Sequence, residues 1–173
     1  MGRIRRFLVR LGESGMATVE FGLIGMAYLM MILGAIEISY ATFLQVVLDN
    51  AARDSARQIR TGQVQVASAP QTTFSTLICK EVSWLIPCTS LLYQVQAFWQ
   101  WSEAQSGMNT ALTRNTDGSL SSAGFDAGSP GEIVIVTVTY NYSFFTPWMA
   151  KLLGGSYGAT LLTSTVVFQN EPF

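Results

Sequence analysis

The sequence contains no histidine and few charged residues of either sign. Without histidine it lacks the commonest general base, the commonest zinc ligand, and any catalytic arrangement that pairs histidine with serine or cysteine. The sparse charges leave no basic face of the kind that nucleic acids require. The sequence also shows no nucleophile motif, no cluster of metal ligands and no glycine-rich phosphate loop. We therefore expect no enzymatic activity, no cofactor or metal, and no nucleic-acid partner.

Cysteine is scarce as well, because the chain has only Cys79 and Cys88. Their spacing is not the CxxC of redox catalysts. Both follow the apolar segment described next, so a disulfide is expected if that part of the chain lies outside the cytoplasm. The bridge would close a loop of about ten residues, contribute roughly 2–3 kcal/mol, and tie a helix to the strand after it. The alternative is two buried thiols.

One long apolar run dominates the N-terminal part of the sequence. Residues 21–36 carry no charge, and residues 16–19 extend the run to the roughly 20 residues that span a bilayer, provided that Glu20 is tolerated. A basic leader at residues 1–15 precedes the run. Its charges predict one membrane pass with a cytoplasmic N-terminus and a periplasmic C-terminal part. The basic residues of the leader are Arg3, Arg5, Arg6 and Arg10.

Two acids lie near the ends of this run. A carboxylate at the middle of a membrane helix costs roughly 3 kcal/mol, and Glu20 lies near the cytoplasmic end, where the cost is lower. One interpretation of Glu20 is a snorkelling or protonated acid near the interface, and the other is the role in assembly that the resemblance below implies. Glu37, with Tyr40 beside it, is expected to mark the outer membrane–water boundary.

The helical pattern continues past the membrane to Thr61, where Gly62 offers a left-handed C-terminal cap. A helix over residues 16–61 would be roughly 70 Å long. Three arginines share one face near its end and form either a subunit contact or a solvated surface. The predicted periodic positions are Phe43, Val46, Val47, Asn50, Ala51 and Asp54, and the arginines are Arg53, Arg57 and Arg60.

Residues 63–173 are predicted to form a small domain with short helices and about three strands, which gives an α+β fold. The strands can form an antiparallel sheet that packs on the long helix. The acids Asp117, Asp126 and Glu132 are scattered and are expected in turns. In order, the expected elements are a turn at 63–70, a helix at 73–82, a strand at 92–101, a long loop at 102–130 with a turn at 115–118, a strand at 132–144, a helix at 147–153 and a strand at 159–169.

The stretch ESGMATVEFGLIG at residues 13–25 resembles the processing site of class IV prepilins. In such proteins a membrane peptidase cuts after a glycine, and a glutamate is the fifth mature residue. The resemblance implies a cut between Gly15 and Met16, with Glu20 at the fifth position. The pair Glu20–Phe21 is similar to the Glu-Tyr or Glu-Phe pair of the Flp/Tad branch. An ordinary secretory signal fits less well, because the small residue precedes the apolar core and no Ala-x-Ala follows it.

Three further stretches resemble the TadE-like family of pilus-assembly proteins: ARQIRTG at 56–62, GFDAGSPGEIVIV at 124–136 and FQNEPF at 168–173. The resemblance implies a minor pilin or pseudopilin of a Flp/Tad (type IVc) pilus, active in pilus assembly, adhesion or secretion. Its partners would be the prepilin peptidase, other Tad pilins or pseudopilins, the assembly platform and inner-membrane lipid. In a filament, Glu20 would pair with the amine of a neighbouring Met16. Met16 replaces the usual phenylalanine, which leaves its N-methylation open.

The expected organisation has three parts: a cleaved leader at 1–15, a long helix at 16–62 that spans the membrane within 16–37, and a periplasmic domain at 63–173. Removal of the leader would shift the formal net charge from −1 to −4, because four arginines and one glutamate leave with it. The alternative is an uncleaved single-pass membrane protein with a periplasmic scaffold or sensing domain, in which the leader persists.

Overall fold

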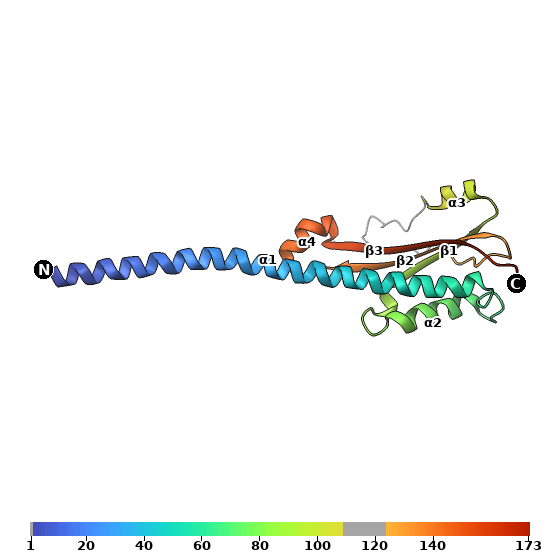
Figure 1. The fold of residues 1–173 in the computed structure, drawn as a ribbon, viewed down its shortest axis with the longest axis horizontal. Helices are drawn as coiled ribbons and strands as arrows, with labels where there is room; N and C mark the ends of the chain where they lie inside the picture. Colours follow the sequence, from blue (N-terminus) through green and yellow to red (C-terminus); the bar gives the residue numbers. More distant parts are fainter. Residues whose placement is uncertain (1, 109–123) are drawn as a thin grey trace. The chain divides into compact units, whose positions relative to one another are not determined.

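The computed structural model describes residues 2–108 and 124–173 (Figure 1), with side chains described for 15–107 and 124–173. The chain divides into two units, Met1–Ser39 and Tyr40–Phe173. We call them unit 1 and unit 2. The predicted turn at 115–118, with Asp117, lies outside the described residues.

A single uninterrupted helix, α1 (Gly2–Arg60), forms unit 1 and continues into unit 2. It begins within the leader, earlier than the predicted start at Met16, and ends one residue before the predicted Thr61. Among the described residues it is the one helix long and apolar enough to cross a membrane, and only 11% of its most apolar window is buried. A core helix of a soluble protein would be mostly buried, so this exposure favours a single membrane anchor.

The end of α1 is set by Gly62, as predicted. Its φ of 78° lies in the left-handed region that glycine adopts without strain. The Gly62 N–H donates to the Ile59 carbonyl at 3.0 Å, and the Gln63 N–H donates to the Gln58 carbonyl at 3.0 Å. These two bonds form a Schellman motif, which satisfies carbonyls that a helix end would otherwise leave unpaired.

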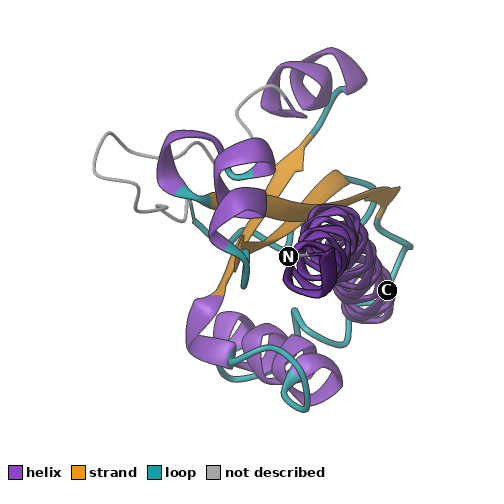
Figure 2. Ribbon diagram, turned by 90° about the vertical axis from the view of Figure 1, so that its left-hand side faces the viewer, coloured by secondary structure: helices purple, strands orange, loops and turns teal. Residues whose placement is uncertain are grey.

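Unit 2 contains the predicted three-stranded antiparallel sheet, in the order β1-β2-β3. In its register, Val95 lies opposite Val136, which lies opposite Val166. Helices lie on both sides of the sheet (Figure 2). The fold class, a long N-terminal apolar helix followed by a small α+β domain, is therefore confirmed. The strands are β1 (Leu91–Phe98), β2 (Ile133–Ser143) and β3 (Ala159–Gln169), and the last matches its predicted bounds.

The main core lies between one face of the sheet and two helices, the unit 2 part of α1 and α2 (Pro70–Val82). Small residues on α1 allow the sheet to approach closely, and larger ones fill the gaps. Each fully buried aliphatic or aromatic side chain contributes roughly 1.5–3 kcal/mol. The core includes Leu44, Leu48, Ala52, Ala56 and Ile59 from α1, Phe74, Ile78 and Val82 from α2, and Val95, Val134, Val136, Val138 and Tyr142 from the sheet.

Only some of the periodic positions predicted on α1 lie on its buried face in unit 2. Phe43 and Val46 are 46% and 51% exposed, whereas Leu44 and Leu48 are buried. The sequence around these positions is apolar on more than half of the helix circumference, so periodicity alone does not select the face. Contact with the sheet selects it.

The first strand ends earlier than predicted. β1 stops at Phe98, whose register partner Ile133 is the first residue of β2, so a longer β1 would have nothing to pair with. Trp99 and Trp101 are exposed, and Trp101 opens a helix, α3 (Trp101–Met108), within the predicted loop. Ala104 is buried against Ile133 and Ile135 and holds α3 on the second face of the sheet.

The short helices complete unit 2. α2 begins at Pro70, three residues before its predicted start, because proline suits the first turn of a helix. After β2, the chain forms α4 (Pro147–Leu153) as predicted, with Thr146 before it and Gly154 after it. Two 3₁₀ turns, η1 (Cys88–Ser90) and η2 (Gly155–Tyr157), lead into β1 and β3.

Candidate processing and assembly site

The expected cleavage point lies within α1. Gly15 and Met16 are both helical, and both are exposed. A Cβ added at Gly15 would meet nothing within 4 Å, as also at Gly22 and Gly25. Glycine inside a helix costs about 1 kcal/mol relative to alanine. Packing among the described side chains therefore does not explain why residue 15 is glycine.

Glu20 and Phe21 are exposed on the same helix. Glu20 is four positions after Met16, so the two lie on one face, one turn or about 6 Å apart along the axis. No cation of the described side chains forms an ion pair with Glu20. The geometry thus leaves the carboxylate available to a group outside the described residues.

In unit 2 the structure brings together three stretches that are distant in sequence: residues 56–62, 124–136 and 168–173. The Glu171 N–H donates to the Arg60 carbonyl at 3.0 Å, and the Asn170 N–H donates to the Glu132 carbonyl at 2.8 Å. The Arg60 guanidinium also pairs with the Glu171 carboxylate at 3.0 Å. That pair is half exposed, so the backbone bonds contribute more than the charges do.

A buried amide holds this junction together. The Asn170 side chain is 3% exposed, and its Nδ2 donates to the Ala127 carbonyl at 3.0 Å and the Ser129 carbonyl at 3.1 Å. From the other side, Gln65 Nε2 donates to the Ala127 carbonyl at 3.0 Å and the Ile59 carbonyl at 2.9 Å. Buried carbonyls left without such donors would each cost about 1–3 kcal/mol. The junction therefore fixes the end of α1 to the chain's final residues.

Two predicted turn acids belong to the same junction. The Asp126 carboxylate accepts the Gly128 N–H at 3.0 Å, and the Glu132 carboxylate accepts the Ser129 N–H. Their role as turn residues is confirmed. Across the described residues, no group of three or more histidine, cysteine, aspartate or glutamate side chains is placed to hold a metal.

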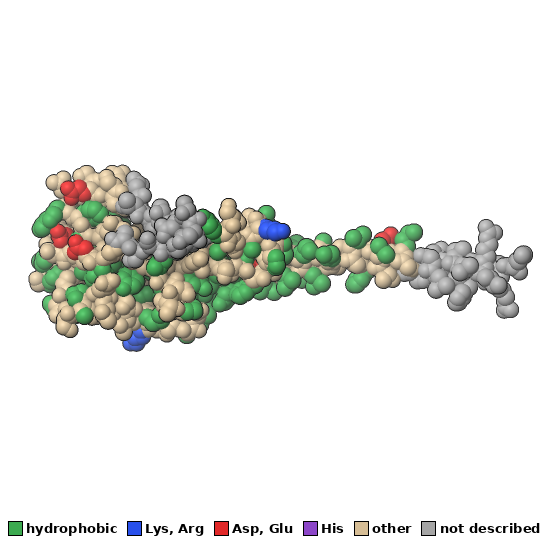
Figure 3. Space-filling view, turned by 180° about the vertical axis from the view of Figure 1, so that it is seen from behind, with side chains coloured by type: hydrophobic (Ala, Val, Ile, Leu, Met, Phe, Trp, Pro, Cys, Tyr) green, Lys and Arg blue, Asp and Glu red, His purple; other side chains and the backbone are tan. Residues whose placement is uncertain are grey.

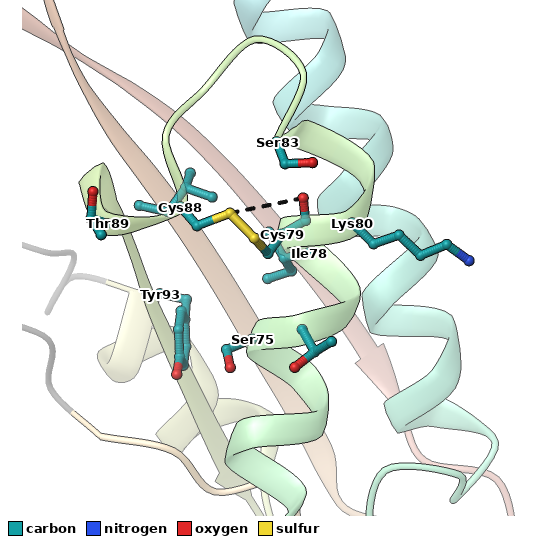
Figure 4. Close-up of a pocket in the computed structure, with 10 residues that line it drawn as sticks. Ser75, Ile78, Cys79, Lys80, Ser83, Cys88, Thr89 and Tyr93 are labelled. Atoms are coloured by element: carbon teal, nitrogen blue, oxygen red, sulfur yellow. Dashed lines mark hydrogen bonds between the residues drawn. A yellow bond between two sulfur atoms is a disulfide. The ribbon is translucent and has the colours of Figure 1, made fainter.

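The predicted disulfide between Cys79 and Cys88 is present, with the Cα atoms 5.5 Å apart. It joins α2 to the 3₁₀ turn that opens β1, so the expected tie between helix and strand is confirmed. Figure 4 shows the bridge in the wall of an open groove of about 490 Å³, with Lys80 extending away from it. The groove is lined by Ile78, Tyr93 and small hydroxyl residues, and it contains no paired acid and base.

A tyrosine pair lies near the start of unit 2. Burial, and then the neighbouring Tyr40, raises the pKa of the Tyr140 phenol above its usual value. Like any tyrosine, Tyr140 is neutral at physiological pH, and the raised pKa keeps it neutral at a higher pH than usual.

Sequence reasoning missed the residues that link the junction. Gln65 and Asn170 are single amides in polar stretches, and nothing local distinguishes a buried amide from a solvated one. Of the three predicted arginines, Arg60 contacts Glu171 within the chain, whereas Arg53 and Arg57 are exposed and form no ion pair with a described side chain. The choice between a subunit contact and a solvated face thus stays open for these two.

Comparison with known proteins finds a similarity confined to the N-terminal helix. No curated protein and no solved structure matches the chain. A family model described as TadE-like protein matches residues 15–57. The match begins at Gly15, includes Glu20 and Phe21, and ends within the last turn of α1. Over residues 15–57, the chain is therefore similar to the TadE-like family.

Proposed function

We propose that this protein is a minor pilin or pseudopilin of a Tad (Flp, type IVc) pilus. A prepilin peptidase cuts it between Gly15 and Met16, and the mature protein contributes to pilus assembly, adhesion or secretion. The observation that carries the proposal is the TadE-like match, which begins at Gly15 and follows the helix to residue 57. The TadE-like family is a pilus protein family and is typically non-enzymatic, in keeping with a structural role.

The exposure of α1 supports an anchored precursor. Large apolar side chains project from the helix on all sides, and exposure of so much apolar surface to water is unfavourable. Lipid covers this surface before assembly, and neighbouring pilin helices cover it afterwards. The basic leader keeps the N-terminus in the cytoplasm of a bacterial cell, so unit 2 lies in the periplasm. The exposed residues include Val19, Leu23, Ile24, Met26, Leu29, Met31 and Leu33.

Glu20 then acts during assembly. Cleavage creates a positively charged amine at Met16, one helical turn from the carboxylate. In the filament, the Glu20 carboxylate pairs with the Met16 amine of a neighbouring pilin, which offsets the cost of a charge among apolar helices. The partners are the prepilin peptidase, other Tad pilins or pseudopilins, and the assembly platform of the inner membrane.

A matched pair of variants tests the processing step. Gly15→Leu places a bulky side chain at the cleavage point, whereas Gly22→Leu makes the same change where a side chain also meets nothing within 4 Å. Each is expressed in full length with a Tad prepilin peptidase, and the mass of the product is measured. The wild-type chain and Gly22→Leu should lose residues 1–15, and Gly15→Leu should keep them. Equal cleavage of both variants would contradict the assignment of Gly15.

One observation favours the alternative function, an uncleaved membrane protein with a periplasmic scaffold or sensing domain. The Gly15–Met16 peptide bond lies inside a continuous helix, and a protease must unwind a helix before it can cut it. On this alternative, the wild-type chain would retain its leader even when the peptidase is abundant.

A further inference from the structure

Exposed apolar residues gather around the start of unit 2. We call this surface the apolar rim. Two of its members are far more exposed than core residues of similar type, with Trp84 at 66% and Leu152 at 69%. The rim comprises Phe43, Trp84, Phe145, Leu152, Leu153 and Tyr157.

Ring contacts place the rim beside the first turns of α1 in unit 2. The Tyr40 and Phe145 ring centroids are 5.8 Å apart, and those of Phe43 and Trp84 are 6.1 Å apart in an edge-to-face arrangement. The other members belong to α4, which Figure 1 shows at the same end of unit 2, and to η2, which follows α4 directly. These contacts therefore place Phe43, Trp84 and Phe145 beside the first turns of α1 in unit 2, near Tyr40.

The composition of this part of the chain is that of a membrane interface. Residues 144–158 contain no acid and a single cation, Lys151, which is exposed in the last turn of α4. Aromatic side chains concentrate at the headgroup level of bilayers, and lysine there is attracted to anionic lipid.

The opposite end of unit 2 carries acidic side chains. The acids Glu103, Asp126, Glu132 and Glu171 belong to α3 and the C-terminal junction, and Figure 3 shows acidic side chains gathered where the chain ends. The unit 2 part of α1 spans about 30 Å between the two ends. Unit 2 thus has one apolar end bearing Lys151 and an opposite end where several acids lie together with Arg60.

We propose that the apolar rim lies in the headgroup region of the membrane while the protein is anchored, and so orients unit 2 on the bilayer surface. Chain continuity identifies this occupant, because Tyr40 lies only four positions after residue 36, where the apolar run that forms the anchor ends. The inference rests on the proposed membrane anchor. It adds that unit 2 itself contacts lipid and does not stand free of the surface.

Single-tryptophan reporters in the full-length chain test the contact. One reporter keeps Trp84, and a second carries Leu152→Trp. The control carries Val66→Trp, because Val66 is 82% exposed and follows the far end of α1. In the Trp84 reporter, the native tryptophans at positions 99, 101 and 148 are replaced by phenylalanine. In the other two variants, all four native tryptophans, at positions 84, 99, 101 and 148, are replaced by phenylalanine. Circular dichroism and an intact Cys79–Cys88 bridge establish that each variant is folded.

The variants are reconstituted in phosphatidylethanolamine–phosphatidylglycerol vesicles whose acyl chains are brominated close to the headgroups. Bromine quenches tryptophan fluorescence only at short range. Both Trp84 and the Leu152→Trp reporter should be quenched several-fold more strongly than the Val66→Trp control. This difference should not change with the ratio of protein to lipid.

Flotation of the vesicles distinguishes failure of the membrane anchor from failure of the rim contact alone. If the chain does not float with lipid, the anchor and the rim contact both fail. If it floats but neither reporter, or only one, is quenched beyond the control, the rim contact is wrong and the anchor stands. If quenching of the reporters declines as protein is added at constant lipid, a second copy of the chain covers the rim, and this also overturns the proposal.

Discussion

At the scale of single residues, Gly62 is under two constraints. Its φ of 78° is strained for any other residue, and a Cβ there would collide with the ring of Phe173. Gly131 has a similar φ of 83° but open space around it, so it serves as the control. Gly131→Ala should lower the free energy of unfolding by about 1–2 kcal/mol from backbone strain alone, and Gly62→Ala should lower it further.

Unfolding of the full chain in detergent, followed by circular dichroism, measures both losses. Adding Phe173→Ala should recover part of the loss in Gly62→Ala and none of it in Gly131→Ala. Equal losses in the two glycine variants would show that the contact with Phe173 contributes nothing.

The buried amide of Asn170 gives a second prediction at this scale. Asn170→Asp removes the N–H groups that the Ala127 and Ser129 carbonyls accept, and it buries an acid among them. We expect a loss of about 2–4 kcal/mol in the free energy of unfolding. The control is Gln169→Glu, because the exposed Gln169 amide makes one bond, to the Gly131 carbonyl. It should lose under about 1 kcal/mol, and a similar loss in both variants would contradict the structural role of Asn170.

At the scale of elements, the disulfide joins α2 to the beginning of β1. Replacing both cysteines by serine releases a loop of about ten residues, so the free energy of unfolding should fall by roughly 2–3 kcal/mol. Thermal unfolding of the variant and of the reduced wild-type chain should give the same lowered midpoint. An unchanged midpoint in the double variant would mean that core packing alone holds α2 in place.

Elements marked by a clear local pattern, such as alternating apolar residues or a glycine cap, could be predicted from the sequence. β3 and most of β2 follow from alternation between turn residues, and the end of α1 follows from Gly62. The face of α1 in unit 2 and the end of β1 could not be predicted in the same way. Both depend on what lies opposite: Leu44 is buried because the sheet covers it, and β1 ends at Phe98 because β2 begins at Ile133.

In the candidate site, too, residues with a local sequence signal could be predicted, and residues that depend on distant contacts could not. Gly15, Met16, Glu20 and Phe21 form a local motif, so the sequence alone identifies them, and their role in processing stays a prediction. The C-terminal junction depends on contacts between residues 56–62, 124–136 and 168–173, and its linking amides carry no local signal.

At the scale of the whole molecule, the two units have different surroundings. Only 11% of the most apolar window of the helix in unit 1 is buried, so this window requires lipid or other helices around it. Unit 2 has its own core, disulfide and C-terminal junction. The family match lies on α1, so the proposed function depends on how this helix is processed and inserted.

The most direct test is the N-terminal sequence of the protein recovered from membranes, with and without the cognate prepilin peptidase. The pilin account predicts a new terminus at Met16 that appears only when the peptidase is present. An intact leader under both conditions would contradict it and would assign the chain to the uncleaved single-pass membrane proteins.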